Sequence, residues 1–166
     1  MFTLKKLSDT SIEAALEKAT RYRLLNEPDD AESICRDVLT IAPDNQEALV
    51  TLTLALTDQF DVSLSGRYQE SGEVVAQLQG EYEREYYAGI VSERRAKAIC
   101  HRATPGWGYV AYEWFRRAME SYERAENLRP QDNDDALLRW NSCARTIMQT
   151  PEIKPEESPS SPLQLE

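Results

Sequence analysis

Two stretches of the chain repeat one pattern, in which a helical segment ends at a proline and a new segment starts with acidic residues and Ala-Leu. They read AESICRDVLTIAPDNQEAL, from Ala31 to Leu49, and AMESYERAENLRPQDNDDAL, from Ala118 to Leu137. Proline cannot continue a helix because it lacks the N–H donor and clashes with the preceding turn, whereas an acidic residue favours a helix start. The chain has only 6 glycines, so long helices are expected in preference to many short strands.

Apolar residues recur at the three- and four-residue spacing of helices with one apolar face. The expected helices cover residues 11–27, 29–42, 44–60, 74–102, 109–128 and 133–148. The segment 61–72 has weak periodicity, and no helix is assigned there. Gly80 and Gly89 are expected to mark a break or a close helix crossing.

Small and aromatic residues precede the two prolines, with Ala31 and Ala118 each 12 residues before and Cys35 and Tyr122 each 8 residues before. They are Tyr22, Ala31 and Cys35 before Pro43, and Ala118, Tyr122 and Ala125 before Pro130. Small alanines let two helices approach closely, and the larger residue fills the space between them. With the closing proline, this pattern resembles that of the tetratricopeptide-repeat (TPR) family. The resemblance implies an all-α fold, a short TPR-like array of antiparallel helix pairs forming an α-α superhelix; a generic helical bundle is the alternative.

The spacing of the prolines sets the expected organisation. Pro43 and Pro130 lie 87 residues apart, about 19 more than two ideal repeats of 34 residues. We therefore expect an N-terminal extension (1–10), a helical repeat domain (11–149) and, within that domain, a longer and irregular middle unit (about 61–108). Residues 150–166 are rich in Pro, Glu and Ser and are expected to be a disordered tail.

The net charge of the chain limits the classes of molecule that it is expected to bind. The formal net charge is −10 and the pI is about 4.7, so the phosphates of nucleic acids and anionic membranes repel the chain. No apolar run reaches the ~20 residues that span a bilayer, and the first residues lack the apolar core of a secretory signal. The three cysteines are far apart, as in a reducing compartment. We expect a cytoplasmic protein that binds neither nucleic acid nor membrane.

No residue pattern indicates catalysis, a metal or a cofactor. Cys100 and His101 are adjacent, and neighbouring residues on a helix do not face each other. One histidine with scattered cysteines does not supply three or four converging metal ligands, and no phosphate-binding glycine motif is present. The expectation is a protein that is not an enzyme and has no cofactor; an enzyme that uses Cys100 is kept as a third hypothesis.

The resemblance also implies a binding surface, because in such repeats the first helix of each pair lines the groove. We expect a protein-interaction module or adaptor that binds a partner protein or peptide there. The alternative is a homo-oligomeric assembly protein whose repeat faces associate with each other. The expected partner-binding residues are Leu16, Thr20, Arg23, Val50, Leu54, Arg84, Tyr87, Val91, Arg94, Arg95 and Asn141.

A double substitution tests this surface. Tyr87→Ala with Arg94→Glu is expected to abolish partner capture, because aromatic and arginine residues dominate interface energetics. Helicity, measured by circular dichroism, is expected to stay unchanged. Capture that survives both changes would contradict the assignment.

Overall fold

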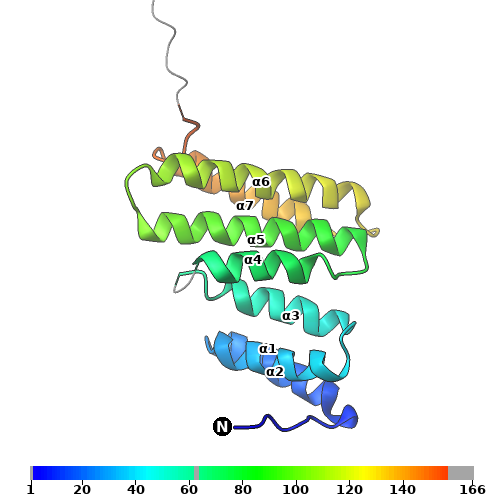
Figure 1. The fold of residues 1–166 in the computed structure, drawn as a ribbon. Coiled ribbons are helices and arrows are strands. Elements are labelled where there is room, and N and C mark those ends of the chain that lie inside the picture. Colours follow the sequence, from blue (N-terminus) through cyan, green and yellow to red (C-terminus); the bar gives the residue numbers. More distant parts are fainter. Residues whose placement is uncertain (1, 62–63, 157–166) are drawn as a thin grey trace, which may run out of the picture.

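The regular structure of the chain is helical throughout the residues described by the computed structural model, 2–61 and 64–156 (Figure 1). The expected all-α fold is therefore confirmed. None of the helices in this part of the chain is long and apolar enough to cross a membrane. The elements are η1 (Asp9–Ser11), α1 (Ile12–Leu24), α2 (Pro28–Ile41), α3 (Gln46–Thr57), α4 (Leu64–Val75), α5 (Glu81–Arg102), α6 (Trp107–Leu128) and α7 (Asp135–Gln149).

The helices form a stack of antiparallel pairs (Figure 1). Each helix contacts the next one in the chain, and α1 also contacts α3, as α3 contacts α5. The first helices of successive pairs therefore lie side by side, which is the arrangement of a helical repeat protein. The pair α1–α2 lies at one end of the stack, and α7 packs against α6 at the other.

The two prolines of the repeated pattern lie in turns between helices, as expected. Pro43 follows α2, and Pro130 follows α6. The start of α3 is capped by Asn45, whose side chain accepts a hydrogen bond from the Ala48 N–H at 2.9 Å. Asn45 thereby satisfies one of the N–H groups left free in the first turn.

The buried residues form one large cluster around α1–α5 and a second around α5–α7. The residues that carry the repeated pattern lie in these clusters. Ala31, Cys35, Ala118, Tyr122 and Ala125 are all fully buried. The alanines therefore have the expected position between packed helices.

The middle of the chain is more regular than expected. Helix α4 occupies Leu64–Val75, although its Ser and Gly residues weaken the apolar periodicity. It buries Ser71, Val74 and Val75, while a Cβ added at Gly72 would meet no atom within 4 Å. The extra length between Pro43 and Pro130 lies in α5, within this unit, and in α6, which follows it; each has 22 residues.

The chain after α7 corrects the expected start of the disordered tail. Ile153 is 3% exposed and packs in the cluster around α5–α7. The backbone carbonyl of Glu152 lies so close to Gly108 that a Cβ there would come within 1.9 Å of its oxygen. Residues 150–153 are thus part of the folded unit, and residues 157–166 of the predicted tail lie outside the described residues.

Gly89 lets α5 pack closely against Tyr122 of α6, and its replacement by Ala tests this close approach. An added Cβ would come within 2.4 Å of Cε1 of the buried Tyr122 ring, so Gly89→Ala is expected to lower the free energy of unfolding by about 1–3 kcal/mol. The matched control is Gly72→Ala on α4, which has open space and is expected to gain about 0.5–1 kcal/mol from helix propensity. Urea denaturation measures both, and a Gly89→Ala variant as stable as the wild type would disprove the close approach.

Candidate functional site

Charged side chains cross the face of the stack that is formed by the first helices α1, α3 and α5 and by α7. We call this set the charged strip. It consists of Arg23, Asp58, Glu93, Arg94, Lys97 and Arg139.

Asp58 joins two cations from different helix pairs. It follows the last residue of α3, and its Oδ2 accepts a hydrogen bond from Arg23 Nε of α1 at 2.8 Å. Its Oδ1 pairs with Nη1 of Arg94 from α5. Burial lowers the pKa of Arg94 to about 10, and the positive charges of Arg23 and Arg139 add to this effect. Arg94 still carries its charge at neutral pH, and one carboxylate thus links the first and third helix pairs.

Glu93 is the most deeply buried charge of the strip. Its side chain is 1% exposed, and its carboxylate receives donors from three helices. Tyr122 of α6 donates its hydroxyl at 2.6 Å, Lys97 of α5 donates Nζ at 2.5 Å, and Arg139 of α7 lies at 3.3 Å. Burial and the charge of Glu93 raise the pKa of Tyr122 well above its usual value, so Tyr122 remains a donor.

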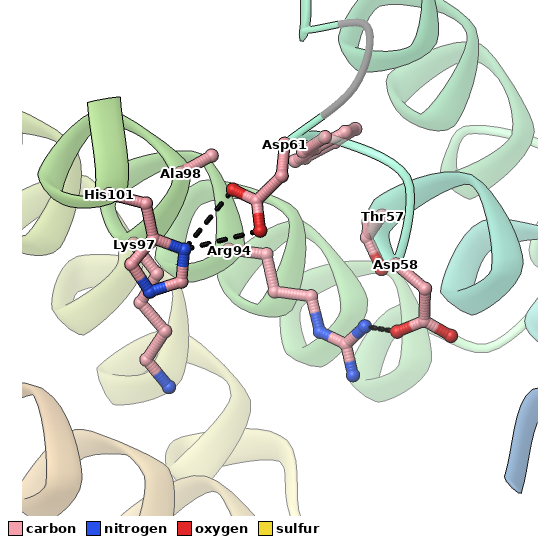
Figure 2. Close-up of a pocket in the computed structure, with 8 residues that line it drawn as sticks. Thr57, Asp58, Asp61, Arg94, Lys97, Ala98 and His101 are labelled. Atoms are coloured by element: carbon pink, nitrogen blue, oxygen red, sulfur yellow. Dashed lines mark hydrogen bonds and ion pairs between the residues drawn. The ribbon is translucent and has the colours of Figure 1, made fainter. Parts of the chain in front are cut away.

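A hollow of about 200 Å³ opens where α3 ends beside α5 (Figure 2). His101 faces Asp61 across it, with Nδ1 at 3.2 Å from both carboxylate oxygens. Arg94 and Lys97 line the same hollow. The hollow is lined by Thr57, Asp58, Phe60, Asp61, Arg94, Lys97, Ala98 and His101.

A second hollow, of about 400 Å³, lies between α5 and α7. It is lined by Tyr86, Glu93, Lys97, Asp135, Leu138, Arg139 and Ser142. Lys97 belongs to both hollows, so they adjoin along α5. We call the two together the α5 groove.

The α5 groove has the chemistry of a binding surface for charged and polar groups. Cations and carboxylates alternate along it, and many of them are partly shielded from water, where electrostatic interactions are stronger. Neither Cys100 nor Cys143 is prepared for nucleophilic attack, because burial raises the pKa of both thiols and the thiolate is the reactive form.

No protein-family model matches the chain, and no curated protein or solved structure shows significant similarity to it. The resemblance to the TPR family stays a prediction from the residues.

Two of the predicted binding residues meet in the charged strip. Arg23 and Arg94 come from α1 and α5 and share the carboxylate of Asp58. Thr20 is exposed on α1 but lines neither hollow of the groove. The prediction thus identified two of the cations in this strip and not the carboxylate between them.

The predicted apolar stripe is part of the core instead. Leu16 and Val91 are 2% and 4% exposed, so a partner has little access to them. Val50, Leu54 and Tyr87 are partly buried and pack against the core clusters. The reason is that α1, α3 and α5 need their apolar faces to bind each other and the second helices of the pairs. Because Tyr87 packs there and Arg94 pairs with Asp58, the double substitution Tyr87→Ala with Arg94→Glu is expected to disturb the fold as well, which corrects the expectation of unchanged helicity.

The remaining three predicted residues lie away from the groove. Arg84 fixes the start of α5 by donating Nη1 to the carbonyls of Leu78 and Gln79 at 2.7 and 2.9 Å. Arg95 packs against aromatic rings of α4 and α6. Asn141 lines a hollow of about 330 Å³ between α6 and α7.

The carboxylates and several cations of the groove were not predicted from the sequence. They are Asp58, Asp61, Glu93, Lys97, His101, Asp135 and Arg139. One signal was present, since Arg94, Lys97 and His101 recur at helical spacing and so share one face of α5. The pairs Asp58–Arg94, Asp61–His101 and Glu93–Arg139 join residues 36 to 46 positions apart, which no local spacing reveals.

Removing the buried charge tests the junction of α5, α6 and α7. Glu93→Gln is expected to lower the free energy of unfolding by about 2–4 kcal/mol, because it leaves Lys97 and Arg139 without their buried counter-charge. The matched control is Glu85→Gln, whose partner Arg124 is 55% exposed, and it is expected to cost less than about 1 kcal/mol. Chemical denaturation measures the free energy of unfolding of both variants. Equal losses in the two variants would contradict the role of Glu93.

Proposed function

We propose that this protein is an adaptor that binds a charged, extended segment of a partner protein in the α5 groove. The observation that carries the proposal is the adjoining pair of hollows, whose walls hold Arg94, Lys97 and His101 opposite Asp58 and Asp61. A peptide with both charges and backbone amides has complementary groups for such a surface.

The shape of the groove favours a chain over a compact ligand. The two hollows follow α5 and share Lys97 rather than forming one enclosed cavity. An extended peptide can place successive side chains in successive hollows, whereas small ligands are usually held in one deep and mostly apolar pocket. The predicted resemblance to TPR proteins, in which first helices line the groove, supports the same function.

The charge of the groove also differs from that of the whole chain. Arg94, Lys97 and Arg139 offset three of the four carboxylates that line it, and the fourth, Asp61, faces His101, while the chain as a whole has a formal net charge of −10. A partner segment with mixed charges therefore meets less repulsion in the α5 groove than elsewhere on the protein.

Self-association is the second candidate, and the end of the stack at α7 favours it. Leu138 and Met148 are 61% and 81% exposed there, and the hollow between α6 and α7 contains Leu137 and Trp140. No further helix covers this end in the part of the chain that the structure describes. Exposed apolar faces at the end of a repeat array tend to associate.

Two variants with equal formal charge test the adaptor function. Lys97→Ala with His101→Ala removes groups that line the groove, while Arg21→Ala removes an exposed cation on α1 that lines neither hollow. A partner retained on the immobilised wild-type chain is expected to lose about tenfold or more in affinity for the groove variant and to bind the Arg21→Ala variant normally. Partners that bind all three chains equally would contradict the site.

Light scattering coupled to size exclusion separates the two candidates. An adaptor is expected to have the mass of one chain over a wide concentration range and to form a complex with its partner. A mass of two chains, with no partner retained by the immobilised protein, would contradict the adaptor function and support self-association.

A further inference from the structure

A second surface lies where α5 meets the second helices α4 and α6. There the guanidinium of Arg95 occupies the corner between two aromatic rings. Its Cζ lies 3.9 Å from the centroid of the Tyr68 ring and 4.0 Å from that of Trp114. The two rings meet edge to face, with centroids 5.1 Å apart, so they hold the guanidinium in one place.

Arg95 has no anionic partner among the atoms that the structure describes. Its Nε is buried and makes no hydrogen bond, and none of the described carboxylates lies within ion-pair distance. The partly buried arginines of the charged strip behave differently, since Arg23, Arg94 and Arg139 each pair with a carboxylate. Arg84 also lacks a carboxylate, but it donates to two backbone carbonyls, whereas the buried Nε of Arg95 has no acceptor.

Arg117 places a second cation against the same indole. Its Cζ lies 4.5 Å from the centroid of the Trp114 ring, and it too has no carboxylate partner among the described side chains. Stacking on aromatic rings compensates part of the lost hydration of a cation but does not neutralise its charge. Two such cations on one ring leave a positive surface in an acidic protein. We call these four residues, Tyr68, Arg95, Trp114 and Arg117, the aromatic–arginine patch.

We propose that the aromatic–arginine patch is a docking site for an acidic segment of a partner protein, whose Glu or Asp carboxylates pair with the guanidiniums of Arg95 and Arg117. A carboxylate matches the planar fork of a guanidinium and accepts two parallel hydrogen bonds from it. Because the rings already hold Arg95 in place, little side-chain entropy is lost on binding. Tyr68 and Trp114 supply apolar surface for the neighbouring residues of the segment, and aromatic and arginine residues are typical of interface centres. The proposal does not depend on the α5 groove, which lies on the other side of α5.

The test uses the full chain and a short dye-labelled peptide of alternating Glu and Ala, compared with the same peptide carrying Gln in place of Glu. Fluorescence anisotropy is measured at about 150 mM salt, where long-range repulsion by the acidic chain is screened. The Glu peptide is expected to bind the wild type about tenfold or more tightly than the Gln peptide. Binding of the two peptides with equal affinity would overturn the proposal.

Three substitutions that each remove one positive charge locate the site. Arg95→Gln is expected to weaken binding about tenfold, and Arg117→Gln about threefold, whereas Arg145→Gln, at an exposed position on α7, is expected to change it less than about twofold. Equal weakening by all three would show a general charge effect and overturn the proposal. Arg117 is exposed, so its variant keeps the test valid if Arg95→Gln disturbs the packing of α4, α5 and α6.

Two further arms define the ligand chemistry. Arg95→Lys keeps the charge and removes the fork, so it is expected to bind the Glu peptide nearly as weakly as Arg95→Gln. Full binding by the Lys variant would contradict the bidentate contact. A peptide with phosphoserine in place of Glu is expected to gain no more than about twofold; a much tighter, Arg95-dependent complex would overturn the choice of a carboxylate.

Discussion

The buried carboxylate of Glu93 holds the C-terminal half of the structure together. A charge with 1% exposure is costly unless several donors compensate its lost hydration. Here the donors come from Tyr122, Lys97 and Arg139, on three different helices. These contacts join α6 and α7 to α5 at one point, so this interaction helps to position α7 and with it the wall of the second hollow.

Several of the charged side chains that line the α5 groove also hold the helices together. Asp58 joins Arg23 to Arg94 across the end of α3, as Glu93 joins α5 to α7. Such side chains are held in place by partners within the fold, so they present fixed charges to a ligand at little cost in entropy. Lys97 and His101 are less constrained, with side chains 44% and 66% exposed, and are therefore the groups most available for direct contact.

The sequence predicts the fold better than it predicts the site. The prolines after α2 and α6, and the alanines that precede them, indicate packed helix pairs because their effects are local. Helix α4 was not predicted, because a helix that buries a serine and exposes glycines lacks a clear apolar periodicity. The site depends on the stacking of α1, α3, α5 and α7, which brings Asp58 to Arg94 and Glu93 to Arg139. Arg94 and Arg95 illustrate the limit, since adjacent residues on a helix differ by about 100° in direction and only the packing shows which one faces the groove.

Helix α5 therefore presents two different environments to arginine. On one side Arg94 has a carboxylate within the fold, and its charge contributes mainly to the arrangement of the helices. On the other side Arg95 packs against Tyr68 and Trp114 and pairs with none of the described carboxylates; in the proposed complex the acidic segment supplies the acceptor. Since the two sides are separate, one segment in the α5 groove and another at the aromatic–arginine patch can be bound at the same time. If both belong to one partner, binding of the first raises the effective concentration of the second, so two individually weak contacts suffice for a stable complex.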